Sequence, residues 1–288
     1  MSGTPPLFEC RGCGYRREDT WHPAPCPFCH RRWNLKQARI ATEHGPVVED
    51  GERVSINDVV EGPEEPRIVL GRDLAPIDRV LGGGLVPGTL ILLTGPPGVG
   101  KSTFALAVLR RVAETLPVIY FSGEEAIKRV VSRARRLGPF PDRCEVVKEH
   151  DLDAMIDQID DAGAKVVVVD SIQTVSCASP TTGDELDPGG ALAISVAVAA
   201  LAEHAQQEDV VVILIGRVTR DNTTVGPRGG LDHAVDVVLT LDGDPHKPQR
   251  TLTAEKNRHG QTAQAEAKFN MTGTGLVPTE EGGPNADA

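Results

Sequence analysis

Aromatic residues are scarce in this chain of 288 residues, which contains two Trp, two Tyr and six Phe. This scarcity excludes an extended platform of aromatic side chains on which nucleic-acid bases could stack. Long hydrophobic runs are missing too, since the longest apolar stretch, residues 191–202, is interrupted by Ser195 and is too short to cross a bilayer. The N-terminus carries charged residues and cysteines in place of an apolar leader. We therefore expect a cytoplasmic protein with no membrane partner.

Positive charge is in deficit, because 30 Lys and Arg stand against 41 Asp and Glu and leave a net charge of −11. If this negative charge were spread evenly along the chain, it would argue against a nucleic-acid-binding protein. It is not spread evenly: residues 46–66 hold seven acidic residues and one basic residue, whereas residues 1–45 hold seven basic and four acidic residues. The net charge therefore leaves room for a local basic surface.

Cysteine is rare as well, and four of the six cysteines lie in two pairs near the N-terminus, Cys10 with Cys13 and Cys26 with Cys29. Two such C-x2-C turns, twelve residues apart, can direct four thiolates at one Zn²⁺ ion. Two disulfides are the alternative, which a reducing cytoplasm disfavours. The spacing predicts a structural zinc knuckle, a rubredoxin-like ribbon, within residues 1–45.

Strand and helix patterns alternate after an acidic segment, residues 46–66, whose three Pro and two Gly are typical of a linker. Buried β-branched runs that alternate with helices predict an α/β fold with a parallel central sheet over residues 67–278. Residues 279–288 are expected to be a disordered tail. The predicted strands are residues 90–94, 118–122, 166–170, 210–215 and 235–241, with antiparallel strands in 250–277, and the predicted helices are 101–114, 125–137, 152–162 and 191–205.

A glycine-rich segment joins the predicted strand 90–94 to the predicted helix 101–114. It matches the G-x4-G-K-[ST] pattern in full, and the backbone N–H groups of such a loop bind phosphates at a helix N-terminus. Lys101 would contact the β- and γ-phosphates, and the Ser102 hydroxyl would ligate Mg²⁺. The predicted site for ATP and Mg²⁺ consists of Gly95, Gly98, Gly100, Lys101, Ser102 and Thr103.

Acidic residues follow two of the predicted strands. Asp170 ends the apolar run 166–170 and is the expected second Mg²⁺ ligand. Glu124 and Glu125 follow strand 118–122, where a carboxylate can polarise the attacking water as a general base. Either glutamate could instead stabilise the N-terminus of the next helix. We assign the catalytic role to Glu124 and the helix-start role to Glu125.

Taken in order, several segments resemble the RadA (Sms) family of bacterial DNA repair proteins: the cysteine pairs, residues 81–88, the glycine-rich loop, and residues 122–125, 169–174, 226–228 and 256–260. The resemblance covers about residues 7–278. It implies a RecA-like P-loop ATPase, stimulated by DNA, that acts in homologous recombination and branch migration. It also implies a ring, most simply a hexamer, that works at the nucleoid on single-stranded DNA or recombination intermediates, with a RecA-type recombinase as a further partner.

The resemblance also implies roles for basic residues. Lys256 and Arg258 match the family's Lys-Asn-Arg motif and are expected to act catalytically at a neighbouring subunit's nucleotide, or on DNA. Residues 174–190 and 217–230 match the DNA-binding loops of RecA-like proteins. The expected DNA contacts are Arg217, Arg220 and Arg228, for which surface salt bridges are the alternative.

The chain departs from the family pattern in three respects. His259 and Arg217 stand where the family has Phe and His, and the family's C-terminal domain, which resembles Lon protease, is absent. Two other functions stay open. Residues 81–88 also resemble circadian-clock-type RecA relatives, which with the acidic balance leaves open a signalling or scaffold ATPase without a DNA role. The missing domain leaves open a truncated regulator of full-length rings. The basic run 128–136 is interpreted as a solvated helix face or a subunit contact rather than a DNA contact.

Overall fold

The computed structural model describes residues 67–216, 231–244, 246–260 and 266–279, and three short strands nearer the N-terminus. The chain divides into two compact units, Met1–Glu64 and Glu65–Ala288. The boundaries predicted for the linker 46–66 and the tail 279–288 fall almost wholly outside the described residues and stay predictions.

Three short strands form the described part of the first unit. The strand β1 (Leu7–Cys10) pairs antiparallel with β2 (Arg16–Glu18) on one side and with β3 (Leu35–Gln37) on the other. Cys13, Cys26, Cys29 and the side chain of Cys10 lie outside the described residues. The four-cysteine zinc knuckle therefore stays a prediction.

The second unit is built on a nine-stranded sheet in the order β12-β11-β10-β9-β4-β8-β7-β5-β6. The six strands from β9 to β6 are parallel, and β10, β11 and β12 continue the sheet antiparallel. The strands are β4 (Leu90–Thr94), β5 (Val118–Ser122), β6 (Cys144–Val147), β7 (Val166–Asp170), β8 (Val211–Ile215), β9 (Val237–Asp242), β10 (Gln249–Asn257), β11 (Glu266–Thr272) and β12 (Gly275–Pro278).

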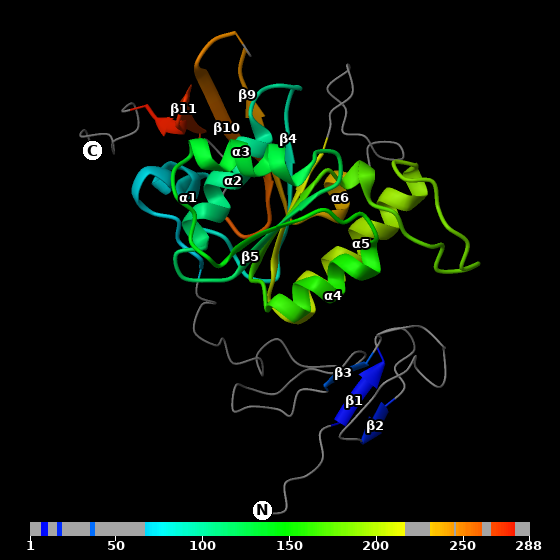
Figure 1. Cartoon of the computed structure of the whole chain (residues 1–288). Coiled ribbons are helices and arrows are strands. Elements are labelled where there is room, and N and C mark those ends of the chain that lie inside the picture. The colour runs from blue at the N-terminus through cyan, green and yellow to red at the C-terminus, as the bar shows by residue number, and fades with distance from the viewer. Residues whose placement is uncertain are drawn as a thin grey trace, which may run out of the picture. The chain divides into compact units, whose positions relative to one another are not determined.

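Helices cover both faces of this sheet (Figure 1). One face packs against α1 (Ala75–Leu81), α2 (Lys101–Val112) and α3 (Ile127–Arg136), and the other packs against α4 (Leu152–Ala162), α5 (Ala191–Glu208) and α6 (Leu231–Ala234). Two 3-10 turns, η1 (Arg72–Leu74) and η2 (Ile172–Thr174), complete the described elements. Because the central strands are covered on both sides, successive residues such as Leu92 and Leu93 are both buried, in opposite clusters.

The predicted parallel α/β core is confirmed, and three strands have the predicted bounds. The helix α3 begins two residues later than predicted, and α5 extends three residues further. The strand β6 was not predicted because it has four residues, lies at the sheet edge and includes the exposed Glu145. No helix in the described part of the chain is long and apolar enough to cross a membrane.

Candidate functional site

The glycine-rich loop lies between β4 and the N-terminus of α2. The φ angles of Gly95, Gly98 and Gly100 are 142°, 78° and 112°, values that favour glycine because it lacks Cβ. Gly100 is the N-cap of α2, a helix of 12 residues, and no side chain caps that end. The loop therefore offers backbone N–H groups and the positive end of a helix dipole, which together suit a phosphate group.

Lys101 and Ser102 stand at the start of α2, followed by Thr103. The Lys101 Nζ donates to the carbonyl oxygens of Gly95 at 2.7 Å and Pro96 at 3.1 Å, so its ammonium lies over the loop that is to bind phosphates. The Ser102 Oγ donates to Asp170 Oδ2 at 2.6 Å, across 68 residues of sequence. The structure thus brings together the two predicted Mg²⁺ ligands.

Tyr120, which sequence reasoning missed, is the second hydroxyl on Asp170. Its OH donates to the same Oδ2 oxygen from the neighbouring strand β5. Burial and the adjacent Asp170 carboxylate raise the pKa of Tyr120 far above its ordinary value, so the hydroxyl keeps its proton and remains a donor. A polar residue inside the buried run 118–122 was the available signal.

The Ser102–Asp170 pair fits Mg²⁺. A hydroxyl and a carboxylate supply hard oxygen ligands, the type that Mg²⁺ prefers, and substrate phosphates and water complete such a site in P-loop proteins. Among the described residues no group of three or more His, Cys, Asp or Glu is placed to hold a metal ion.

Glu124 and Glu125 have different environments. Glu124 Oε1 accepts a hydrogen bond of 3.1 Å from Ser171, the residue after Asp170. Both Glu125 carboxylate oxygens accept from Arg133 of α3, at 2.8 and 2.7 Å. Because α3 begins at Ile127, Glu125 lies before the first turn of the helix and not within it. Its carboxylate pairs with a side chain of α3 instead of occupying the predicted position at the helix start. Of the two, Glu124 is the carboxylate that lies beside the end of β7.

Arg250 supports the glycine-rich loop from behind. Its side chain is buried and its Nε donates to Val99 O at 2.7 Å. Its NH1 donates to the carbonyl oxygens of Asp244 and Lys247 in the β9–β10 turn and of Gln249 at the start of β10. Sequence reasoning missed this residue because its partner Val99 is 151 positions away. The arginine fixes the middle of the loop, between Gly98 and Gly100, to the sheet.

Replacing this arginine, Arg250→Met, is expected to weaken ATP binding and to lower the free energy of unfolding by about 3 kcal/mol, because buried carbonyl oxygens lose their donor. Chemical denaturation and the Kd of a fluorescent ATP analogue measure the two effects. Arg250→Lys keeps the positive charge but lacks the several N–H donors of the guanidinium group, so it should lose less stability and less ATP affinity than Arg250→Met. An unchanged Kd in a folded Arg250→Met protein would refute the supporting role.

The same loop contacts the sheet at Gly95. A Cβ atom built on Gly95 would lie 2.1 Å from Leu241 O, a backbone atom that cannot move aside. Gly95→Ala is therefore expected to destabilise the protein by about 3 kcal/mol and to weaken ATP binding, through the clash and the strained φ. Gly163→Ala is the matched control, since its φ is +58° and nothing lies within 4 Å of its Cβ position. Thermal unfolding of both variants separates the clash from backbone strain.

Lys256 and Arg258 lie away from this loop. Asn257, between them, pairs with Val237 at the start of β9, and Val237 pairs with Ile91 near the start of β4. The glycine-rich loop follows the other end of β4. The Lys256 Nζ donates to Val235 O at 2.7 Å, and an Arg258 NH1 atom lies 3.2 Å from Asp236 Oδ1. The structure does not bring these two residues to the loop of their own chain.

The two segments predicted to bind DNA differ in what the structure describes. Arg217, Arg220 and Arg228 lie outside the described residues. Residues 174–190 are described and fold back on themselves, with Ser179 N donating to Asp184 O at 2.7 Å and Leu186 N donating to Cys177 O at 2.9 Å. This segment contains three acidic residues and no Lys or Arg, so it offers no cation to a phosphate.

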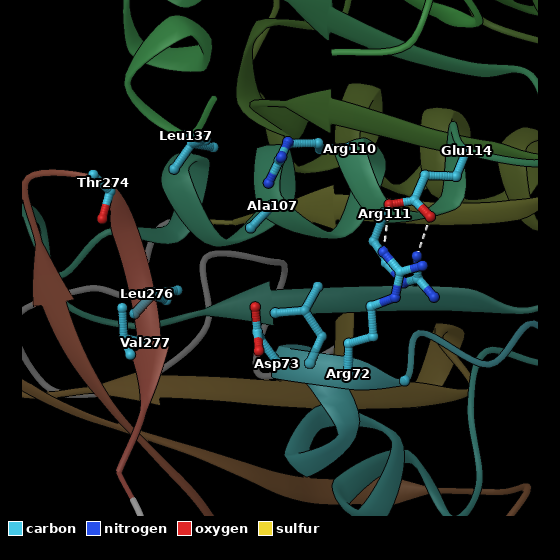
Figure 2. Close-up of a pocket in the computed structure, with 12 residues that line it drawn as sticks. Arg72, Asp73, Ala107, Arg110, Arg111, Glu114, Leu137, Thr274, Leu276 and Val277 are labelled. Atoms are coloured by element: carbon cyan, nitrogen blue, oxygen red, sulfur yellow. Dashed lines mark hydrogen bonds and ion pairs between the residues drawn. The ribbon is translucent and has the colours of Figure 1, made fainter. Parts of the chain in front are cut away.

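A pocket of about 340 Å³ lies between η1, the C-terminal half of α2 and β12 (Figure 2). Glu114 lies between Arg111 and Arg72, with which it forms ion pairs, and Arg110 donates to Pro139 O at 2.9 Å. The hydrogen bond from Arg111 holds the pKa of Glu114 below its ordinary value. The pocket is not the nucleotide site, because the glycine-rich loop is at the opposite end of α2.

The fold, the glycine-rich loop and the Ser102–Asp170 pair define a P-loop protein with a RecA-type core. The chain belongs to the AAA domain family, whose family model matches residues 69–222.

Comparison with curated proteins gives individual relatives of the chain. The chain is 36% identical over 288 residues to the DNA repair protein RadA of Bacillus subtilis and 34% identical over 285 residues to that of Escherichia coli. These matches cover 96% and 93% of this chain but 60% and 58% of the two relatives, so the chain spans about three fifths of their length. A KaiC-like protein from Pyrococcus horikoshii shares the fold, with a TM-score of 0.58 at 20% identity over 74% of this chain and 99% of that protein.

Proposed function

We propose that this chain is a DNA-dependent, Mg²⁺-dependent ATPase of the RadA type that acts in DNA repair and homologous recombination. The observation that carries the proposal is the Ser102–Asp170 pair at the glycine-rich loop, in a chain whose relatives named RadA align with 93–96% of it. Its substrates would be single-stranded DNA or recombination intermediates at the nucleoid, and a RecA-type recombinase would be a further partner.

The residues of this chain divide the work of ATP hydrolysis. The loop N–H groups and Lys101 bind and orient the phosphates, and Ser102 and Asp170 would hold Mg²⁺, which would neutralise charge on the phosphate oxygens. Glu124 accepts a proton from the attacking water as its oxygen bonds to the γ-phosphorus and the bond to ADP breaks. The Ser171 hydrogen bond orients the Glu124 carboxylate.

Lys256 and Arg258 lie at the opposite end of the parallel strands from the glycine-rich loop, and they would act on a second copy of the chain. Lys256 and Arg258 lie away from their own glycine-rich loop, so a role at a nucleotide requires a head-to-tail assembly in which they reach the neighbour. By resemblance to the RadA family, this assembly would be a closed ring of six copies. Arg217, Arg220 and Arg228 would contact DNA phosphates.

Phosphate release from ATP, measured with and without single-stranded DNA and with and without Mg²⁺, tests the proposal. We expect hydrolysis that requires Mg²⁺ and rises on addition of DNA. An ATPase that neither binds nor responds to DNA at low salt would favour the signalling or scaffold alternative. A chain that alters a full-length RadA ring, yet is inactive alone, would favour the regulator alternative.

Zinc is a separate part of the proposal and rests on the spacing of Cys10, Cys13, Cys26 and Cys29. The purified protein should contain one Zn²⁺ per chain by elemental analysis, and Cys10→Ser should lose it. A metal-free wild-type protein with intact thiols would refute the knuckle without affecting the ATPase proposal.

A further inference from the structure

A band of positive charge follows the exposed side of α3. Lys128, Arg129, Arg135 and Arg136 are all exposed, as is Ser132. At about 100° per residue these five positions fall within roughly 120° around the helix, with Ser132 in the middle. They extend over about 12 Å of the helix axis. We call these five residues the α3 face.

The cations of the α3 face have no side-chain partner in the described part of the chain. Arg133, the fifth cation of the helix, differs because it is paired with Glu125. The helix itself contains no acidic residue. The four cations share one side of the helix with no acidic residue among them, so this face is electrostatically uncompensated until an anion covers it.

We propose that the α3 face binds the phosphate backbone of a nucleic-acid strand, an inference that rests on the proposed DNA-dependent function. Three of its four cations are arginines, whose forked guanidinium groups bind phosphate oxygens in pairs. A protein partner would require an apolar centre, and this face has none. The exposed apolar residue of α3, Ile127, lies at the end of the helix.

The position of α3 connects this face to the predicted DNA contacts. The segment that contains Arg217 begins after Gly216, at the end of β8, and the loop that leads into α3 begins at the end of β5. Only β7 separates these parallel strands, so the two chain exits lie about 10 Å apart on one edge of the sheet. The end of β8 and the loop that leads into α3 therefore lie at the same end of the sheet.

The same face is connected to the proposed general base. Arg133 pairs with Glu125, and the carbonyl oxygen of Glu125 accepts a hydrogen bond of 2.8 Å from Ser122 Oγ at the end of β5. The residue between Ser122 and Glu125 that the mechanism uses is Glu124. A DNA strand that binds to α3 and immobilises it would therefore also restrain the loop that contains Glu124. This connection provides a route by which DNA could stimulate hydrolysis.

Two variants of the full-length chain test the proposal with fluorescein-labelled oligo-dT by fluorescence anisotropy over a salt series. Ser132→Glu places an acid three or four residues from every cation of the face, without removing one, and leaves the helix intact. The triple variant Arg129→Gln, Arg135→Gln, Arg136→Gln removes three cations. We expect each to weaken binding about tenfold at low salt, and the triple variant to reduce the salt slope by about 2.

The matched control, Arg79→Gln, Lys247→Gln, Lys268→Gln, changes the net charge equally at exposed positions of other elements. It should keep most of the affinity, and all three variants should keep basal hydrolysis without DNA. If the wild-type chain binds oligo-dT and both α3 variants bind it with the same affinity, the α3 face is not a DNA site. An equal loss of affinity in the control would overturn the α3 proposal in the same way, without affecting the DNA function. A wild-type chain that binds no oligo-dT would overturn the DNA function itself. A triple variant that binds oligo-dT normally but has a lower mass in solution would make the face a contact between copies.

Discussion

Glu124→Gln is expected to lower the rate of ATP hydrolysis by about 10²–10⁴-fold while ATP still binds. Gln keeps the shape of the side chain and can still accept the hydrogen bond from Ser171, but it cannot take a proton from water. The phosphate-binding loop, Ser102 and Asp170 are untouched. Phosphate release under single-turnover conditions measures the loss, and the Kd of a fluorescent ATP analogue shows that binding persists.

Glu125→Gln is the matched control, because it makes the same change one residue further along the chain. It weakens the charged pair with Arg133, which is partly exposed, so we expect a loss of about 1 kcal/mol of stability or less. Hydrolysis without DNA should stay within a few-fold of wild type. A Glu125→Gln protein without hydrolysis beside an active Glu124→Gln protein would reverse the two roles.

The sequence alone was sufficient for the parts of the site that depend on local pattern. Strand, glycine-rich loop and helix are contiguous in residues 90–112, and each carries its own signal: a buried apolar run, glycines at positive φ, and Lys101 at the helix start. Asp170 could also be assigned, because a carboxylate at the end of four buried valines has no packing role. These are short-range features, which a single sequence records.

Features that depend on distant contacts could not be predicted. Tyr120 meets Asp170 because β5 and β7 are neighbours, and Arg250 meets Val99 because the β9–β10 turn packs behind the loop. Neither adjacency is encoded in a local motif. The different environments of Glu124 and Glu125 likewise depend on the side chain of Arg133, which lies nearly two turns into a helix whose start was predicted two residues too early.

The position of the Lys-Asn-Arg segment in the sheet could not be predicted from a local pattern either. The family resemblance implied that Lys256 and Arg258 act at a neighbouring subunit's nucleotide or on DNA, but no local pattern specified at which end of the parallel strands they stand. The strand order and register place them level with the start of β4, with β9 in between, and β4 extends about 13 Å from there to the end that leads into the glycine-rich loop. Their proposed catalytic role therefore becomes a statement about assembly.

Arg258→Ala is expected to reduce ATP hydrolysis by about 10³-fold, because a guanidinium supplied to the transferring phosphate is worth that order of rate. In its own chain Arg258 is about half exposed and pairs with Asp236 at 3.2 Å, so its removal should cost little stability. Phosphate release and thermal unfolding measure the two effects. Arg79→Ala, an exposed arginine on α1, is the control for the loss of a surface charge.

Mixing two inactive variants tests whether Arg258 acts between copies. An Arg258→Ala chain keeps its own Glu124, and a Glu124→Gln chain keeps its own Arg258. In a randomly mixed head-to-tail ring about one quarter of the interfaces join a sound Glu124 to a sound Arg258, so about a quarter of wild-type activity should return. Mass measurement establishes that mixed assemblies form. If they form and hydrolysis stays absent, Arg258 does not act across the interface, and its effect must arise within its own chain through Asp236.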